Sequence, residues 1–235
     1  MNVDEQARPG FEDLSVIIPT LNAAGVLGAC LDRLVEARGA QVIVVDGGSC
    51  DGTLGIGRAH GVVLVSADRG RGVQLHAATN RARGPWLLFL HADTRLQIGW
   101  SRAARAWMAG TAAAEGFAVF AFKLDSDDWR ARLLERLVDL RVRWIGLPYG
   151  DQGILMHRNL LERVGGYAAL PLMEDVDLVR RLGHARLNLL DAYAMTSADR
   201  WRRDGWVRRS LRNLTCLALF QLGVSPHRIA RFYER

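Results

Sequence analysis

Cysteine and long apolar runs are both scarce in this chain of 235 residues, and each scarcity excludes a class of protein. Three cysteines, Cys30, Cys50 and Cys216, are too few and too scattered for a disulfide framework or a thiolate zinc site, which favours a reducing, cytoplasmic setting. No apolar run reaches the roughly 18 residues needed to span a bilayer. The first dozen residues carry charges of both signs, so they do not resemble a secretory signal peptide.

Lysine is scarcer still, because arginine supplies almost all of the positive charge. Lys123 is the only lysine among 31 basic residues, and the formal net charge is +6. A basic balance favours anionic partners such as phosphates, nucleic acid or anionic lipid. The hydrophobic fraction of 49% is ordinary for a globular protein, and the length suits one α/β domain.

Three short apolar segments in the first half of the chain each end in a polar loop. Residues 14–18, 41–45 and 86–90 predict strands, and the spacing between them predicts a β-α-β-α-β-α-β order with a further strand at 62–65. This order is typical of a doubly wound, mostly parallel sheet with flanking helices. Because parallel strands end at one edge of a sheet, we expect the polar loops to meet there around a ligand.

The loop after residue 90 reads His91-Ala92-Asp93-Thr94. Its carboxylate, Asp93, could anchor Mg²⁺ or Mn²⁺ on the phosphates of a nucleotide, or it could cap the next turn. The loop after residue 45 adds Asp46 and Gly48, where a glycine lets the backbone approach a ligand closely. Arg69 and Arg71 lie either in a basic loop facing phosphates or in a solvated turn.

Two acidic segments in the second half of the chain are candidates for binding and catalysis. Asp151 and Gln152 lie between glycines, where they could hold a hydroxylated substrate or satisfy their own turn. Glu174 and Asp175 open a predicted helix, whose macrodipole favours acids at that end. Adjacent carboxylates can also raise one pKa, which suits a general base near neutral pH.

The remaining segments are amphipathic or basic. Residues 187–190 predict an edge strand, and residues 197–203 favour a nucleic-acid contact, a diphosphate clamp or a salt-bridged turn. Residues 127–144 predict a long helix, whose apolar stripe indicates core packing, with contact to a membrane or partner as the alternative. The stripe consists of Trp129, Leu133, Leu137, Leu140 and Trp144. Residues 206–232 are helical in period and basic.

Taken in order, these motifs resemble the inverting family 2 glycosyltransferases with the GT-A fold. The resemblance covers about residues 14–201 and rests on segments 17–22, 44–53 and 89–94 and on Glu174-Asp175. Residues 150–153, 173–175 and 200–201 are similar to a short bacterial subgroup linked to arsenosugar biosynthesis. The resemblance implies a single GT-A domain over residues 1–235, in four parts. These are a lead-in (1–13), a nucleotide-binding half (14–125), an acceptor-binding half (126–201) and a C-terminal basic helical segment (202–235).

The resemblance also implies a role for each motif. Asp175, with Glu174 beside it, would be the general base that deprotonates the acceptor hydroxyl, and Asp93 would bind the divalent ion. Contacts to the acceptor would come from Asp151, Gln152, Arg200 and Trp201. The nucleotide-sugar donor would be bound by Pro19, Thr20, Asn22, Asp46, Gly48, Arg69, Arg71, Gln74, Ala92 and Asp93.

The implied reaction moves a sugar from a nucleotide-diphosphate sugar to an acceptor hydroxyl with inversion. His91 stands where the family's Asp-x-Asp motif has its first acid, so Mg²⁺ or Mn²⁺ would need substrate phosphates as further ligands. The alternatives are a nucleotidyltransferase acting on a sugar phosphate, which would carry a glycine-rich basic loop after the first strand, and a basic, non-catalytic module binding RNA or membrane. We expect no nucleic-acid partner and a cytoplasmic enzyme, whose basic helices allow contact with the inner face of a membrane.

Overall fold

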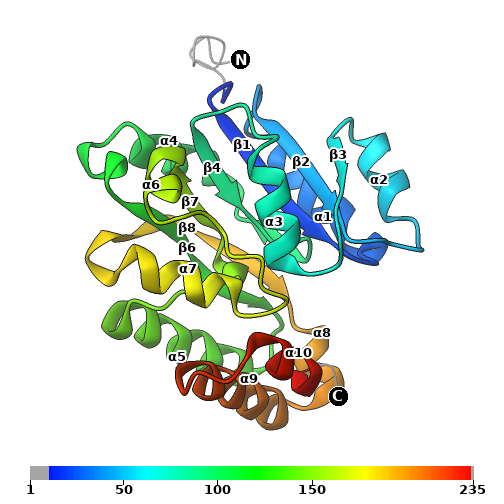
Figure 1. The fold of residues 1–235 in the computed structure, drawn as a ribbon, viewed down its shortest axis with the longest axis vertical. Helices are drawn as coiled ribbons and strands as arrows, with labels where there is room; N and C mark the ends of the chain where they lie inside the picture. Colours follow the sequence, from blue (N-terminus) through cyan, green and yellow to red (C-terminus); the bar gives the residue numbers. More distant parts are fainter. Residues whose placement is uncertain (1–10, 234–235) are drawn as a thin grey trace.

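The computed structural model describes residues 11–233, and within them eight strands form one sheet in the order β3-β2-β1-β4-β7-β6-β8-β5 (Figure 1). The strands are β1 (Leu14–Thr20), β2 (Gln41–Asp46), β3 (Val63–Ser66), β4 (Trp86–Phe89), β5 (Thr94–Leu96), β6 (Phe117–Asp125), β7 (Ile154–His157) and β8 (Leu187–Ser197). The first ten residues of the predicted lead-in lie outside the described residues. Phe11, just after them, is buried and stacks on Trp100.

Ten α-helices are described around this sheet, together with short 3₁₀ segments such as η3 (Gly150–Gln152). The helices are α1 (Ala24–Leu34), α2 (Thr53–Ala59), α3 (Arg71–Thr79), α4 (Trp100–Met108), α5 (Trp129–Ile145), α6 (Arg158–Arg163), α7 (Glu174–Leu182), α8 (Asp199–Asp204), α9 (Trp206–Gln221) and α10 (Pro226–Tyr233). Within residues 11–233, no helix has the length and apolarity required to cross a bilayer.

The N-terminal half of the sheet is parallel, as the order of its elements predicts. Strand β1 pairs in parallel with both β2 and β4, and β2 pairs in parallel with β3. Thr20 lies opposite Asp46 in the register, so the loops that follow β1 and β2 start side by side. Leu90 donates its backbone N–H to Ile17, which brings the loop after β4 to the same edge. The predicted meeting of three polar loops is therefore confirmed.

Both faces of β1, β2 and β4 are largely buried, which explains their continuous apolar runs. Val16 and Ile18 of β1 pack in a cluster with α1 and α4, whereas Ile17 between them packs on the other face with α3 and α7. Successive side chains of a strand point to opposite faces, so each helical layer receives alternate residues. Residues buried on both sides show no polar alternation.

The C-terminal half of the sheet mixes strand directions. Strand β7 is antiparallel to both β4 and β6, β8 is parallel to β6, and β5 is antiparallel to β8. The prediction that residues 187–190 form an edge strand holds for those residues, which pair with β6 alone, but β8 continues to Ser197 and β5 pairs with its residues 194–196. Its later half alternates small buried residues, Ala192 and Ala194, with more exposed ones, a weak pattern that gives little sign of a strand.

Helix α5 corrects a second prediction. All five residues of its apolar stripe, which was expected to pack in the core, are 48 to 79% exposed. The buried face consists of Ala131, Val138 and Val142, which join residues of β6 and α8 in one cluster, and of Glu135, which pairs with Lys123. The helical period identifies an apolar face but does not show which face of the helix packs on the sheet. In α5, the smaller side chains of the opposite face allow a closer approach to β6.

At Gly72, in the first turn of α3, the backbone of the helix lies very close to the backbone of residues 168–170. A β-carbon there would overlap the carbonyl oxygen of Ala168 and lie 2.6 Å from the Leu170 nitrogen. We expect Gly72→Ala to lower the free energy of unfolding by about 1–3 kcal/mol, measured by urea denaturation, because backbone cannot yield as a side chain does.

Gly55 provides the matched control for that variant, since it also lies in a helix. A β-carbon at Gly55 meets nothing within 4 Å, so Gly55→Ala should stabilise the protein by roughly 0.4–1 kcal/mol. Equal stability changes for the two variants would contradict the packing argument.

Candidate active site

A cavity of about 90 Å³ lies beyond the carboxyl ends of β4 and β8, under the C-terminal helices. The predicted residues Asp93, Asp151, Asp175, Arg71, Arg200 and Trp201 all contribute to its wall, although they come from five separate segments. The remaining lining residues are His91, Tyr149, Leu172, Met173, Val176, Thr196, Ser197, Arg209, Asn213 and Tyr233. The structure thus brings the candidate base and the candidate metal ligand to one cavity.

Asp175 is held by backbone donors on both sides. Gly150 donates its N–H to Oδ2 at 2.7 Å, and Val176 donates to Oδ1 at 2.8 Å. A β-carbon on Gly150 would lie 3.3 Å from Asp175 Oδ2 and 2.7 Å from His91 Nε2, so only glycine fits between these two side chains. An ionised carboxylate has about four acceptor positions, which leaves Asp175 able to accept a proton from a ligand in the cavity.

Glu174 points elsewhere, although it is adjacent to Asp175. Its carboxylate is 0% exposed, does not line the cavity, and pairs with Nε of Arg71 at 2.9 Å. Burial raises the Glu174 pKa to about 7, against the opposing influence of Arg71. Neighbouring residues on a helix point in directions about 100° apart, so the two carboxylates lie in different surroundings.

Asp93 faces Arg200 across the cavity mouth at 3.6 Å. Within residues 11–233, no group of three or more His, Cys, Asp or Glu side chains is arranged to hold a metal ion. A single carboxylate fits a different mode of metal binding, in which one protein oxygen and the substrate phosphates together hold Mg²⁺ or Mn²⁺. Burial, with Arg71 nearby, lowers the His91 pKa to about 4, so His91 is a neutral imidazole at pH 7.

A second cleft, of about 330 Å³, extends from Asp93 along the ends of β1 and β4. It collects most of the residues predicted to bind the nucleotide, namely Pro19, Thr20, Asn22, Arg69, Arg71, Gln74, Ala92 and Asp93. Asn22 has a left-handed backbone with φ of 49°, and its side-chain oxygen accepts from the Cys50 N–H at 2.9 Å. This bond fastens the turn after β1 to the loop after β2.

Asp46 and Gly48 are not among the residues lining that cleft. Asp46 accepts hydrogen bonds from the backbone of Gly48 and Ser49 and from the hydroxyls of Ser49 and Thr20. Burial raises the Asp46 pKa, but these hydrogen bonds outweigh it and hold the pKa below its usual value. Asp46 therefore lies one layer behind Thr20, as an ionised carboxylate that shapes the loop.

Gln74 and Gln152 are both committed to the protein backbone. Gln74 donates to the carbonyls of Thr20 and Val45 at 2.8 and 2.7 Å, which joins β1 to β2 where both strands end. Gln152 is buried, donates to the Phe120 carbonyl at 3.0 Å and does not line the cavity, unlike its neighbour Asp151. Burial raises the Asp151 pKa to about 6, and one of its carboxylate oxygens is buried without a hydrogen bond.

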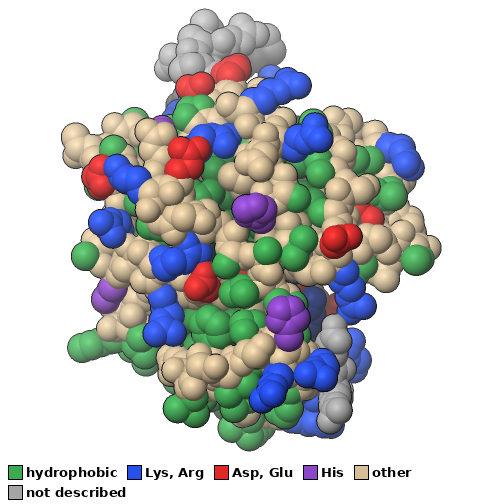
Figure 2. Space-filling view, in the orientation of Figure 1, with side chains coloured by type: hydrophobic (Ala, Val, Ile, Leu, Met, Phe, Trp, Pro, Cys, Tyr) green, Lys and Arg blue, Asp and Glu red, His purple; other side chains and the backbone are tan. Residues whose placement is uncertain are grey.

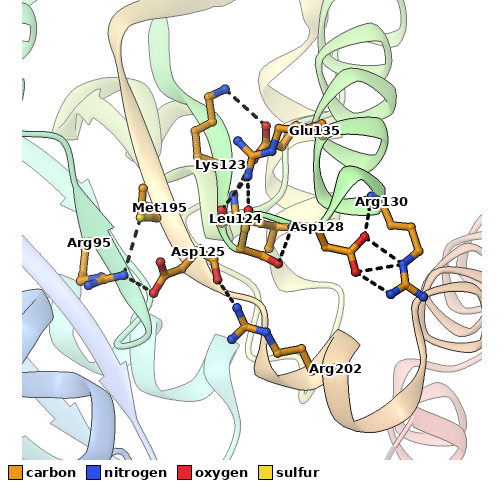
Figure 3. A network of polar contacts seen from close by, with 11 residues as sticks. Arg95, Lys123, Leu124, Asp125, Asp128, Arg130, Glu135, Met195 and Arg202 are labelled. Atoms are coloured by element: carbon orange, nitrogen blue, oxygen red, sulfur yellow. Dashed lines mark hydrogen bonds and ion pairs between the residues drawn. The ribbon is translucent and has the colours of Figure 1, made fainter.

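A polar network anchors α8, the helix that carries Arg200 and Trp201, to the sheet (Figure 3). Arg202 donates to the Asp125 carbonyl at 2.7 Å, and the Asp125 carboxylate pairs with Arg95 of β5 at 2.5 Å. Trp201 is buried and packs with the apolar side chains that β6 and α5 turn toward each other. With its neighbours fixed in this way, Arg200 is directed to the cavity mouth.

Residues of the last two helices complete the cavity, and sequence reasoning missed them. Arg209 of α9 and Tyr233 of α10 both line it, and the Arg209 guanidinium stacks 4.6 Å from the Tyr233 ring centre and donates to its hydroxyl. The only signal in the sequence was a basic helical period, which does not identify the face turned toward the site.

The two raised carboxyl pKa values predict how stability changes with pH. Glu174 and Asp151 have ordinary pKa values of 4.5 and 3.8, against about 7 and about 6 in the folded protein. Both carboxyls therefore bind more protons in the folded state than in the unfolded state across this interval, so their contribution to the free energy of unfolding should fall as pH rises from about 4 to 7. We expect Glu174→Gln to reduce that fall by on the order of 1–3 kcal/mol in urea titrations. Glu162→Gln, at an exposed site, should leave the slope unchanged; a similar reduction there would contradict the assignment.

Comparison with known sequences gives one family and a set of partial relatives. The family model for Glycosyl transferase family 2 matches residues 15–170. A PGL/p-HBAD biosynthesis glycosyltransferase of Mycobacterium bovis and one of Mycobacterium tuberculosis are each 40% identical over 99 residues. The match spans 38% of this chain and 38% of each relative.

Comparison with solved structures shows where the same fold occurs. The structure of S. aureus TarS residues 1–349 with UDP-GlcNAc has a TM-score of 0.62 and 18% identity, covering 79% of this chain and 58% of that one. Glucosyl-3-phosphoglycerate synthase from Mycobacterium tuberculosis, in complex with Mn²⁺, UDP and glucosyl-3-phosphoglycerate, has a TM-score of 0.52 and 20% identity, covering 78% and 70%. At these identities the likeness establishes a shared fold.

Proposed function

Because the chain belongs to glycosyl transferase family 2, we propose that it transfers a sugar from a uridine-diphosphate sugar to an acceptor hydroxyl with inversion. The observation that carries this proposal is the shared cavity of Asp93 and Asp175, which opens beside the cleft after β1 and β4. The choice of uridine follows the UDP and UDP-sugar complexes of the two structural neighbours.

Asp175 is proposed as the general base. The acceptor oxygen attacks the anomeric carbon, its proton passes to an Asp175 oxygen, and the bond from that carbon to the diphosphate breaks with its electron pair on the phosphate. The backbone N–H groups of Gly150 and Val176 fix the carboxylate and its direction, which is the positioning that proton transfer requires.

Arg71 and Arg200 are proposed to stabilise the departing diphosphate. Both line the cavity and the nucleotide cleft, so they lie where negative charge gathers on the leaving group. Asp93 would hold a divalent cation, which supplies further charge stabilisation when it is bound. Glu174 is a positioning residue in this proposal, since its buried pair with Arg71 directs that guanidinium.

A thermal-shift screen tests the proposal directly. UDP and UDP-sugars, added with and without Mn²⁺, should raise the melting temperature by mass action. The matching UDP-sugar should also release UDP without an acceptor, by slow transfer of its sugar to water. A screen in which no nucleoside diphosphate or nucleotide sugar shifts the melting temperature would overturn it. The link to arsenosugar synthesis stays a prediction until acceptors are tested.

A further inference from the structure

A third hollow adjoins the cavity, and its wall is mostly arginine. Its volume is about 570 Å³, and six arginines from α3, α8 and α9 face a single carboxylate, that of Asp204. The six are Arg71, Arg200, Arg203, Arg208, Arg209 and Arg212. We call this hollow the arginine basin.

The basin is continuous with the cavity that holds Asp175. Arg71, Arg200, Arg209, Leu172 and Tyr233 line both spaces, so a molecule in the basin can extend past them to the candidate base. By contrast, Arg208 and Arg212 line the basin alone and do not reach the nucleotide cleft. The basin is therefore separable from the donor site by mutation.

The protein neutralises only part of the positive charge of the basin: Arg71 pairs with Glu174 and Arg200 with Asp93. Asp204 is shared by Arg203 and Arg209, at 2.8 and 3.2 Å. Within residues 11–233, the side chains of Arg208 and Arg212 form no ion pair or hydrogen bond. The Arg209 side chain is only 6% exposed, and its Nε is buried without an acceptor. Arg208 and Arg212 therefore leave uncompensated positive charge in the basin, which favours an anionic ligand.

We propose that the arginine basin binds a phosphate group of the acceptor, so that the acceptor substrate is a phosphorylated hydroxyl compound. This inference rests on the proposed transferase function. Guanidinium groups match phosphate oxygens with paired hydrogen bonds, and the volume leaves room for the organic part of a phosphate ester. A phosphate held by Arg208, Arg209 and Arg212 would leave the rest of the acceptor extending toward Asp175.

The test measures phosphate binding to the UDP-saturated protein by titration calorimetry at constant ionic strength. Inorganic phosphate, glycerol 1-phosphate and dihexanoyl phosphatidic acid are the three probes. We expect the wild-type protein to bind them, and R208Q/R212Q to raise their Kd about tenfold or more while the Kd for UDP stays within about twofold. Tighter binding of phosphatidic acid than of glycerol 1-phosphate would identify a lipid headgroup as the source of the phosphate. Equal binding of the two would identify a free phosphate ester.

The control R136Q/R143Q removes the same charge from exposed positions on α5 and should leave phosphate binding unchanged. Binding of UDP without binding of any phosphate probe would overturn the basin and spare the transferase proposal. Equal weakening of UDP and phosphate by R208Q/R212Q would assign the basin to the donor instead. Failure of wild-type protein to bind UDP would overturn the proposed function itself.

A separate observation concerns the outer surface of α5 and α9. Besides the exposed stripe of α5, helix α9 and the residue that follows it carry an apolar row that is 57 to 80% exposed, made of Val207, Leu211, Leu214 and Leu222. Both helices lie at one end of the molecule, and Arg130 of α5 stacks 5.5 Å from the Trp206 ring of α9 (Figure 1). Figure 2 shows hydrophobic side chains along that lower edge. We call these two rows the apolar end face.

Charge identifies the occupant of the apolar end face. Residues 206–233 contain no Asp or Glu, and their Arg228 and Arg231, like Arg136 on α5, are exposed positive charges outside the arginine basin. A second copy of the chain would bring like charges together, whereas an anionic bilayer supplies the opposite charge. Trp129 and Trp144 stand at the two ends of the α5 stripe, and tryptophan favours the boundary between lipid and water.

The geometry points to the apolar end face lying on an anionic membrane. Full-length protein should sediment with phosphatidylglycerol vesicles more than with phosphatidylcholine vesicles, and W129S/L137S/W144S should lose at least about tenfold in binding. V35S/I98S changes exposed apolar residues elsewhere and should bind normally. No sedimentation with phosphatidylglycerol, or a wild-type dimer that the triple variant converts to monomer, would overturn this assignment.

Discussion

Asp175→Asn is expected to lower kcat by about 10²–10⁴-fold, because it removes the group that accepts the acceptor proton and alters little else. Asparagine has nearly the same shape, and its side-chain oxygen can still accept the Gly150 N–H that now bonds to Asp175 at 2.7 Å, although the Val176 N–H loses its acceptor. UDP binding should therefore survive. The measurement is turnover of the nucleotide sugar identified by the screen, with the UDP Kd determined by calorimetry on the same preparation.

Asp177→Asn is the matched control for this variant. Asp177 lies on the same helix, pairs with Arg181 at 2.6 Å and does not line the cavity. The control makes the same chemical change in the same helix, so we expect kcat to change by less than about twofold. Comparable turnover in Asp175→Asn and wild type would remove Asp175 from the role of base.

Asp93→Ala is expected to abolish the effect of Mn²⁺ on UDP binding. Among residues 11–233, Asp93 is the one carboxylate that lines both the cavity and the nucleotide cleft, so its loss leaves only diphosphate oxygens and water for the ion. In wild type, Mn²⁺ should tighten UDP binding by about tenfold or more; in the variant, the Kd should be the same with and without Mn²⁺.

Metal-free binding provides an internal check on that result. Asp93 also attracts Arg200 at 3.6 Å, and removing the carboxylate frees this guanidinium for the diphosphate. Metal-free UDP binding should therefore be retained or strengthened in Asp93→Ala. Asp191→Ala, at an exposed position of β8, should preserve the Mn²⁺ effect. Persistence of that effect in Asp93→Ala would exclude Asp93 as a ligand.

The sequence predicts the N-terminal half of this fold well because its signals are local. Each of β1, β2 and β4 is a continuous apolar run followed by a polar loop, and parallel pairing brings the loops together without further information. The convergence of Asp93 and Asp175 also agrees with the family motifs. In these strands, burial on both faces restricts the residues to apolar ones, so the local pattern alone is enough to identify them.

The sequence fails where packing between distant segments decides the outcome. The stripe of α5 has the period of a buried helix, yet the close approach of Ala131 to β6 turns the opposite face inward. Gln152 looks like a ligand-binding amide, but the Phe120 carbonyl, 32 residues earlier, takes its hydrogen bond. Arg209 and Tyr233 reach the cavity only because α9 and α10 fold back over it.

The antiparallel insertion of β7 between β4 and β6 has a consequence for how the chain matures. Trp86 of β4 pairs with His157 of β7, and Phe117 of β6 pairs with Leu187 of β8, so closing the sheet joins segments about 70 residues apart. Such non-local contacts form late and slowly. As the polypeptide leaves the ribosome, strands β1 to β4 can pair first, but the cavity is complete only after α10, which carries Tyr233, has been translated. A nascent chain stalled just before that point already contains Asp93 and Asp175 but lacks part of the cavity wall around them.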